Sequence, residues 1–360
     1  MVLAYLIIRD FIRLEVYKKA NQETEVTFLR KQRDNPGNDH RQRAPRRNPA
    51  QGREKGQKDT LMVTHKGMVE YQASRHALNS PGNFKTREEY ILYLIGQSAY
   101  VRAARLSVGK RVLDLGCNTG YGTAILSGQA AMATGADVSA KALRLARKRY
   151  PDRSIDFRQI DGEKLPFEDG SFDLIVSFQV IEHVVDYEKY LGEIKRVLSQ
   201  SGTVLFTTPN ASTRLEPGMP PWNEFHVREF NGEELAALLG GFFSNVSVWG
   251  LSAQAELYAI EMERYRRARE LARKLRQPGL RSLIARISPG FVLQISQKVR
   301  NMLGTDASRL DEGFEAKYSL DDLFYSQENL ARCLDLLAIC SQDRRSLVEA
   351  QEQFVEPPRR

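Results

Sequence analysis

The chain has 360 residues, 42% hydrophobic and 27% charged, which is enough for one substantial core with appendages. Its three cysteines have neither metal-ligand spacing nor the density of a disulfide framework, so we expect a reducing compartment, the cytoplasm. The first apolar run ends at Arg9, which is too short to cross a bilayer, and it lacks the basic start and cleavage site of a secretory signal. Composition therefore favours a globular protein over a membrane-spanning or disulfide-rich secreted one.

The net charge of +8 is distributed unevenly along the chain. Residues 30–58 hold ten Lys/Arg against three Asp/Glu, a net +7, and residues 261–305 hold eleven against three, a net +8. The remainder is net acidic, since +8 minus these two contributions is −7. A basic catalytic face is therefore not indicated, and we expect no nucleic-acid partner.

Residues 1–60 are predicted to be a disordered basic tail, because the stretch from 30 onward has almost no large apolar residue to offset the entropy cost of ordering. Residues 61–110 are predicted to be a helical cap. Its main helix spans 84–106, where apolar residues such as Tyr90, Leu94 and Val101 are separated by polar ones.

A strand, a glycine turn and a helix start follow one another within residues 111–123, Arg-Val-Leu-Asp-Leu-Gly-Cys-Asn-Thr-Gly-Tyr-Gly-Thr. The apolar run before Gly116 suits a strand buried on both faces, and the glycines allow a ligand to approach the backbone closely. A dinucleotide fold would place its glycines as G-x-G-x-x-G, whereas here they stand at 116, 120 and 122. The spacing favours another cofactor.

The second strand, residues 131–138, ends at Asp137, which is 21 positions after Gly116. An acid at this tip can accept hydrogen bonds from both hydroxyls of an adenosine ribose, although a turn or capping role is the alternative. Ser139 is predicted to cap the helix that continues to Tyr150.

Three further strands are predicted around 155–160, 171–177 and 202–208. The first ends in Asp161-Gly162, and the second is followed by Glu182-His183. Asp186 can cap the helix between the last two, whose apolar face includes Leu191 and Ile194.

Together these motifs resemble the class I S-adenosylmethionine-dependent methyltransferases, in particular the family that includes quinone-biosynthesis and glycan methyltransferases. The resemblance covers about residues 70–252 and 331–342. It implies S-adenosylmethionine as the cofactor and a Rossmann-like, seven-stranded sheet with helices on both faces. By the same resemblance the cofactor would be held by Asp114, Gly116, Cys117, Asn118, Gly120, Gly122, Asp137, Val138, Asp161, Gly162, Phe178 and Gln179.

The far end of the chain fits this fold once an insertion is allowed. Residues 243–251 and 334–340 match the sixth and seventh strands, so residues 253–330 are predicted to be a basic helical insertion between the last two strands. The expected organisation is then a core at 111–252, the insertion, a last core strand within 331–342 and a C-terminal tail at 343–360. The insertion could close over the acceptor or lie on an anionic membrane.

Two histidines are the catalytic candidates. His183 follows the fourth strand, and His226 lies in a segment that resembles the acceptor-site region of glycan-pathway methyltransferases. Either imidazole could act as a general base for a hydroxyl acceptor, or could be a structural hydrogen-bonding group. Asp and His do not recur at ligand spacing, so we expect no metal.

The predicted function is methyl transfer to a small-molecule or glycan acceptor, at a hydroxyl. An alternative is a quinone or lipid-headgroup methyltransferase, with its basic helices in peripheral contact with the inner membrane surface. A nicotinamide oxidoreductase is disfavoured by the glycine spacing. A non-catalytic basic adaptor with a methyltransferase-like core is disfavoured because the glycine loop, Asp137 and Asp161 are all intact. The sequence does not define the oligomeric state.

Overall fold

The computed structural model describes residues 84–151, 154–223, 225–275 and 309–355. The N-terminal tail, the first part of the cap and residues 276–308 of the insertion lie outside the described residues. Among the described residues, no helix combines the length and the apolar character needed to cross a bilayer.

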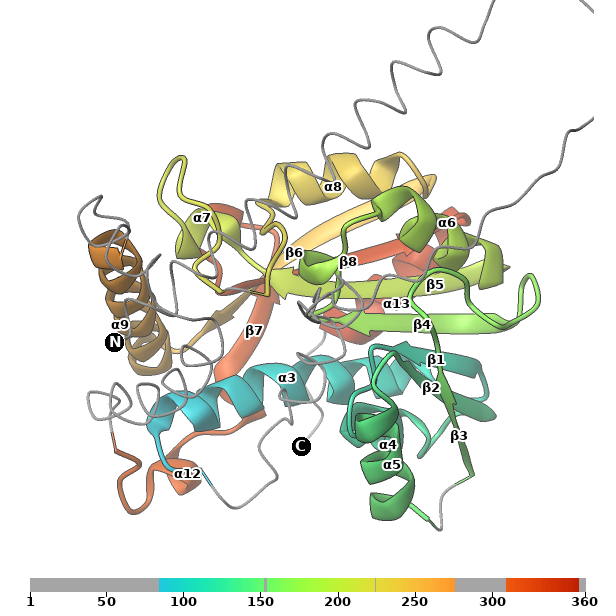
Figure 1. The fold of residues 1–360 in the computed structure, drawn as a ribbon, viewed down its shortest axis with the longest axis horizontal. Helices are drawn as coiled ribbons and strands as arrows, with labels where there is room; N and C mark the ends of the chain where they lie inside the picture. Colours follow the sequence, from blue (N-terminus) through green and yellow to red (C-terminus); the bar gives the residue numbers. More distant parts are fainter. Residues whose placement is uncertain (1–83, 152–153, 224, 276–308, 356–360) are drawn as a thin grey trace, which may run out of the picture.

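A single sheet of eight strands, ordered β3-β2-β1-β4-β5-β8-β6-β7, forms the centre of the fold (Figure 1). β1 to β5 are mutually parallel, and β8 runs antiparallel to both β5 and β6. This is the class I methyltransferase arrangement that the sequence predicts, with one short edge strand added. The strands are β1 Arg111–Leu115, β2 Met132–Asp137, β3 Ile155–Gln159, β4 Phe172–Phe178, β5 Leu198–Pro209, β6 Asn245–Ala253, β7 Leu323–Ser326 and β8 Asp335–Ser341.

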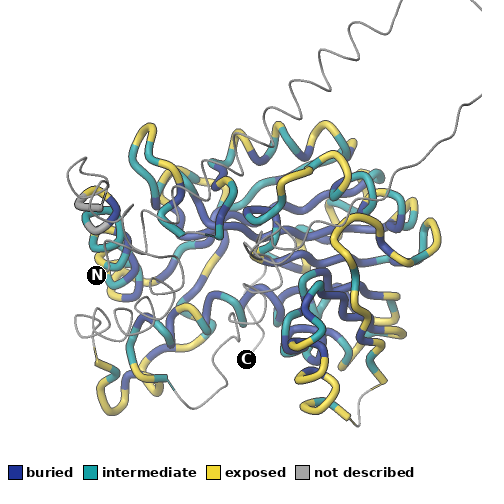
Figure 2. The backbone as a smooth tube through the Cα atoms, viewed as in Figure 1, coloured by how far each residue is buried: buried dark blue, intermediate teal, exposed yellow. Residues whose placement is uncertain are grey.

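Helices cover both faces of the sheet, because successive residues of a strand point to opposite sides. In β8, Leu337 and Ile339 join the core under α3 and α13, whereas Leu336 and Ala338 join the core under α6 and α8. Figure 2 shows the strands buried between exposed outer helix surfaces. The α-helices are α3 Arg87–Leu106, α4 Tyr121–Leu126, α5 Ala140–Arg149, α6 Tyr187–Val197, α7 Ala211–Arg214, α8 Gly232–Gly240, α9 Ala255–Leu275, α12 Phe314–Lys317 and α13 Arg344–Val355; single 3-10 turns are η1 Ile181–His183, η3 Leu320–Asp322 and η4 Leu330–Arg332.

Helix starts follow the predicted caps. The Ser139 side chain accepts a hydrogen bond from the Ala142 N–H, and the Asp186 side chain accepts one from the Lys189 N–H. Both satisfy donors that the first turn of a helix leaves unpaired, so the two caps are confirmed.

Two elements differ from the sequence prediction. Residues 344–355, expected in the C-terminal tail, form helix α13, which buries Ala350 and Phe354 against the core containing α3. Within the stretch expected to be a helical insertion, residues 323–326 add strand β7 to the edge of β6. The described start of that stretch is helical, as predicted: α9 contacts α3, α7 and β6 (Figure 1).

Candidate functional site

A cavity of about 850 Å³ opens at the carboxyl ends of the parallel strands. The loops after β1, β2 and β3 line one part of it, and residues from the β5, β6 and β8 side line the other. β1 and β4 stand side by side at the middle of the sheet, where the chain order reverses, and ligands of doubly wound sheets bind at such a point.

The glycine loop is shaped so that its backbone faces this cavity. Gly116 has φ +86°, and a Cβ there would lie 2.5 Å from Cγ2 of Val180. Asn118 also has a positive φ, 48°, a conformation that Asn tolerates better than most residues. A side chain at 116 would therefore both strain the turn and fill the space between the loop and the end of β4.

Asp137 lines the cavity and at the same time holds the glycine loop. Its Oδ2 accepts a hydrogen bond from the Asn118 N–H at 2.8 Å, and its Oδ1 accepts one from the Ser139 N–H at 2.8 Å. The carboxyl is only 4% exposed, and burial raises its pKa. Since a carboxylate oxygen can accept more than one hydrogen bond, both the predicted ribose contact and the turn role fit the same side chain.

The remaining predicted cofactor residues, with two exceptions, also line the cavity. Asp161 is exposed, and its Oδ1 accepts from the Glu163 and Lys164 N–H groups, which fixes the turn containing Gly162. The others on the cavity wall are Cys117, Asn118, Gly122, Val138, Phe178 and Gln179.

Gly120, where a Cβ would lie 2.7 Å from the Phe157 ring, does not line the cavity. Neither does Asp114, and the prediction that it binds the cofactor is corrected. It is fully buried behind the loop, where it accepts from the Tyr100 hydroxyl at 3.1 Å and the Thr123 hydroxyl at 2.6 Å. Because strand residues alternate in direction, Asp114 points toward α3 and α4, the sides from which these two hydroxyls come. Burial raises its pKa to about 7.

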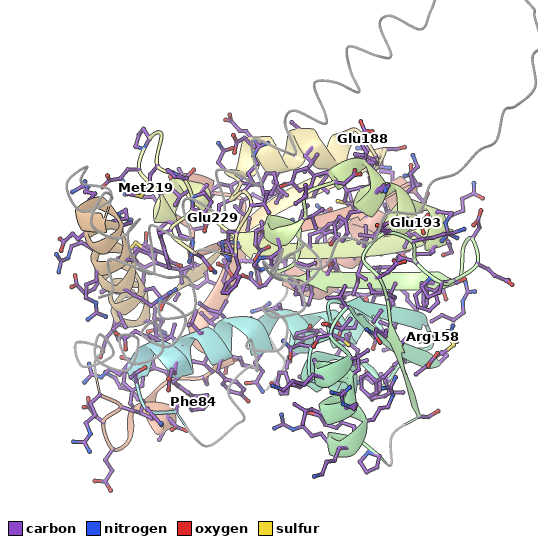
Figure 3. All side chains as sticks on the ribbon, in the orientation of Figure 1. Phe84, Arg158, Glu188, Glu193, Met219 and Glu229 are labelled. Atoms are coloured by element: carbon purple, nitrogen blue, oxygen red, sulfur yellow. The ribbon has the colours of Figure 1, made fainter. Side chains whose placement is uncertain are left out.

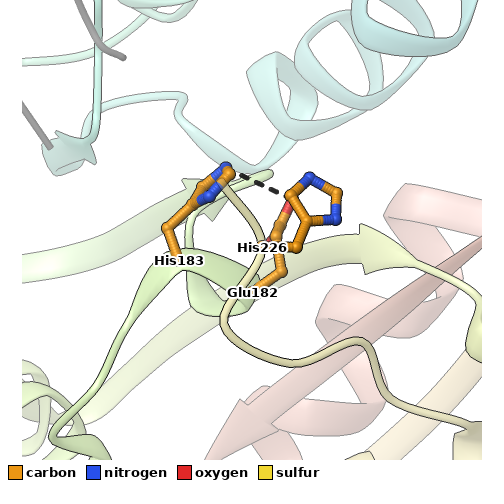
Figure 4. Close-up of side chains that lie close together, drawn as sticks. All are labelled: Glu182, His183 and His226. Carbon is orange, nitrogen blue, oxygen red and sulfur yellow. Dashed lines mark ion pairs between the residues drawn. The ribbon is translucent and has the colours of Figure 1, made fainter. Parts of the chain in front are cut away.

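Both catalytic candidates lie at the cavity, and the structure adds Glu182 to them (Figure 4). The His183 and His226 rings have centroids 4.8 Å apart, and the potential ligand atoms of all three residues lie within 4.8 Å of one another. Glu182 is 1% exposed: its Oε2 accepts from the Thr208 hydroxyl, whereas its Oε1 has no hydrogen-bond partner among the described residues. Burial raises the pKa of this carboxyl to about 8.

Neighbouring groups fix the tautomers of the two histidines. His183 Nδ1 lies 2.8 Å from the Phe225 carbonyl oxygen, which only accepts, so this nitrogen carries the proton. Asn223 Oδ1 accepts from the Phe225 N–H, which turns the Asn223 amide nitrogen toward His226 Nε2 at 2.7 Å. Nε2 of His226 is therefore an acceptor, and its Nδ1–H donates to Glu229 Oε1 at 2.6 Å.

Two arginines that sequence reasoning did not single out also line this part of the cavity. Arg214, 5% exposed, makes an ion pair with Glu229 and stacks on Trp222 at 4.1 Å from the ring centroid. Arg264 of α9 pairs with the buried Glu261. The sequence showed an amphipathic helix here, but whether its arginines face solvent or cavity depends on packing against α3 and α7.

Asp335 at the start of β8 completes this region, with its Oδ2 accepting from the Gln179 amide at 3.0 Å. Burial raises its pKa to about 7. The sequence could have pointed to Glu182, which directly precedes His183, and to Asp335, which lies at a strand end on the cavity side. For Arg214 the sequence offered no such signal.

Comparison with known proteins agrees with this fold. Residues 113–206 match the family model described as a methyltransferase domain. This match covers the segment that holds the glycine loop, and it agrees with the class I methyltransferase arrangement of the sheet. The matched range runs from β1 into β5 and so includes the loops of the predicted cofactor half.

Among individual proteins, a probable S-adenosylmethionine-dependent methyltransferase of Mycolicibacterium smegmatis is 38% identical over 153 residues, which is 42% of this chain and 58% of that protein. A demethylmenaquinone methyltransferase of Clavibacter sepedonicus is 36% identical over 115 residues, 31% of this chain and 47% of that protein. The chain thus spans about half the length of the curated relatives it matches. The crystal structure of the [4+2]-cyclase SpnF aligns at 18% identity with a TM-score of 0.45, covering 77% of this chain and 97% of that one.

Proposed function

We propose that this protein transfers a methyl group from S-adenosylmethionine to a hydroxyl of a small-molecule or glycan acceptor. The observation that carries the proposal is one continuous cavity lined by the glycine loop and Asp137 on one side and by the paired histidines on the other. Residues that can hold the donor and residues that can meet an acceptor therefore face the same space.

The cofactor half fits S-adenosylmethionine on its own geometry. Gly116 leaves open the space that a Cβ would fill, Asp137 retains acceptor capacity for ribose hydroxyls, and Asp161 with Gly162 edges the cavity where the resemblance puts the adenine. When bound, S-adenosylmethionine supplies an electrophilic methyl group for in-line displacement. The chain then has mainly to hold the acceptor in line and to exclude water.

The catalytic roles are assigned to His226 and His183. The Nδ1–H bond to Glu229 keeps the lone pair of His226 on Nε2, which is how a carboxylate orients a histidine that accepts a proton. His183, held by the Phe225 carbonyl, stands beside it. Arg214, Trp222 and Tyr265 would form the wall against which the acceptor binds.

Calorimetry with S-adenosylhomocysteine and a turnover assay test this proposal. The protein should bind the product with micromolar affinity, and incubation of S-adenosylmethionine with candidate metabolite pools should give a product heavier by one CH₂ group. His226→Ala should leave product affinity nearly unchanged and lower turnover by roughly 10²–10⁴, the range for a lost general base. Parental turnover in this variant would shift the catalytic role to His183, and absence of cofactor binding would remove the proposal altogether.

A quinone or lipid headgroup is the second candidate acceptor, favoured by the similarity to the demethylmenaquinone methyltransferase. An acceptor panel that contains demethylquinones in liposomes alongside soluble polyols separates the two. Methylation confined to the liposome fraction would favour the second candidate.

A further inference from the structure

Glu182 places a buried carboxyl oxygen, without a hydrogen-bond partner among the described residues, beside two histidines. Its side chain is 1% exposed, its Oε1 lacks a hydrogen bond among the described residues, and His183 Nε2 lies 3.9 Å from that oxygen. A buried acceptor without a donor costs about 1–3 kcal/mol. Such a group calls for a ligand that supplies positive charge.

The surroundings of the two histidines match those of metal ligands. A histidine that binds a metal usually donates its other ring N–H to a carboxylate or a backbone carbonyl. His183 donates from Nδ1 to the Phe225 carbonyl, and His226 donates from Nδ1 to Glu229. Each Nε2 is thereby set as the coordinating atom.

We propose that Glu182, His183 and His226 form a binding site for a divalent transition-metal cation at the acceptor end of the cavity. Two imidazoles and one carboxylate suit metals such as Zn²⁺, Mn²⁺, Fe²⁺ or Co²⁺, and three protein ligands leave coordination positions open. The proposal departs from the sequence-based expectation of a metal-free enzyme, which rested on spacing along the chain. The third ligand is 43 residues beyond the second, and only the fold brings it close.

The backbone keeps the two ligand segments together. Val227 N–H donates to the Glu182 carbonyl at 2.7 Å, so the loop carrying His226 is tied directly to η1. The potential ligand atoms now lie within 4.8 Å of one another. A bound cation would draw them closer together, since metal–nitrogen distances are about 2.0–2.1 Å. It would also replace the hydrogen bond from the Asn223 amide to His226 Nε2.

The open coordination positions of the metal define the class of acceptor, and this inference rests on the proposed function. An acceptor with two adjacent oxygens, such as a vicinal diol, a catechol or a hydroxyl beside a carbonyl, can occupy two of them. Coordination lowers the pKa of the hydroxyl, as it does for metal-bound water, and the proton is released to solvent. The oxygen then bonds to the methyl carbon while the carbon–sulfur bond breaks with its electron pair on sulfur, giving the methyl ether and S-adenosylhomocysteine. In this scheme both histidines are ligands, so the metal replaces the general-base role proposed above for His226, and the lower turnover expected of His226→Ala would report a lost ligand.

Titration of untagged, chelator-treated protein with Co²⁺, followed by visible absorbance, tests the site without any turnover. We expect one Co²⁺ per chain at this site. Glu182→Gln and His226→Gln should each weaken binding by about 100-fold or more, because changes even to groups behind metal ligands cost 10–100-fold. Glu188→Gln is the matched control, since Figure 3 shows Glu188 on the outside of α6 and its side chain is exposed. S-adenosylhomocysteine affinity and the thermal transition, measured on every variant, confirm that each one is folded.

Asn223→Ala gives an independent test, because it removes the amide N–H that donates a hydrogen bond to His226 Nε2. This variant should bind Co²⁺ more tightly than the parent, and weaker binding would overturn His226 as a ligand. No Co²⁺ binding, or equal binding by parent and Glu182→Gln, would overturn the site. Metal binding at the site without methylation of any acceptor would instead count against the proposed function. Full turnover in the presence of a chelator would show that the metal takes no part in the reaction.

Discussion

At the scale of single residues, Asp137 joins ligand binding to loop structure. Its two oxygens accept from the N–H groups of Asn118 and Ser139. We therefore expect Asp137→Ala to weaken S-adenosylhomocysteine binding by about 1–3 kcal/mol and also to lower the free energy of unfolding, because those donors lose their acceptor in a buried site. Calorimetry and urea denaturation measure the two effects. An Asp137→Ala protein that binds as tightly as the parent would show that the ribose lies elsewhere.

Gly122 gives a second residue-scale prediction, on packing. A Cβ at this position would lie 2.0 Å from the Tyr100 ring, which is held in place by its hydroxyl bond to Asp114. Gly122→Ala should cost about 1–3 kcal/mol of stability through overpacking. Gly192→Ala, in helix α6 with nothing within 4 Å of the new Cβ, is the control and should be neutral or stabilise by up to about 1 kcal/mol. Equal denaturation midpoints for the two variants would contradict this.

Residue-level prediction from sequence worked where the signal was local. The positions of Gly116 and Asp137 relative to their strands were readable from alternation and spacing, and the structure puts both on the cavity. Asp114 was assigned to the same wall although strand alternation turns it away. Arg214 could not be found, because its burial depends on Trp222 and Glu229, which reach it only through the path of a loop.

At the scale of elements, Arg196 of α6 anchors the loop between β3 and β4. Its guanidinium donates to the carbonyls of Leu165 and Phe167 and pairs with Glu193 and Asp169. Figure 3 labels Glu193 on the outer part of this region. We expect Arg196→Ala to lower the free energy of unfolding by about 1–3 kcal/mol, since two carbonyls lose a charged donor. Arg345→Ala, whose pair with Glu349 is exposed, should change little.

The Arg196 network also predicts a pH dependence. The hydrogen bond and charge of Arg196 hold the pKa of Glu193 below its ordinary value of 4.5. The stabilisation is therefore fully present above pH 4.5 and is lost as the pH falls through the lower, folded-state pKa. The stability difference between the parent and Arg196→Ala should shrink between pH 7 and pH 3. A constant difference over that range would show that Glu193 takes no part.

Elements were predictable where one periodic pattern ran long enough. The caps at Ser139 and Asp186 and the strands up to β6 follow from such patterns, with ends displaced by a few residues. Strand β7 has only four residues, and its pairing with β6 is decided by tertiary contact. Helix α13 did carry a stripe, Leu347, Ala350 and Phe354, that would have identified it as a helix.

At the scale of the whole molecule, Arg102 joins three distant parts of the chain. This residue of α3 is 2% exposed and donates to the carbonyls of Phe354 and Val355 at the end of α13 and of Leu323 in β7. Arg102→Leu should lower the free energy of unfolding by about 3 kcal/mol or more, because hydrogen bonds to charged groups contribute about 1.5–3 kcal/mol each. Arg144→Leu, on the exposed side of α5, is the control. Matching denaturation curves for the two variants would refute this role.

The position of β8 has a consequence for how the protein is made. This strand lies between β5 and β6, yet it is synthesised after both and after α9 and β7. While the ribosome is still adding those residues, β5 and β6 each keep an unpaired edge, and such edges attract strands of other chains. Newly made copies are thus open to mispairing until residue 341 has emerged, and completing the sheet requires contacts between segments far apart in the chain, which slows folding.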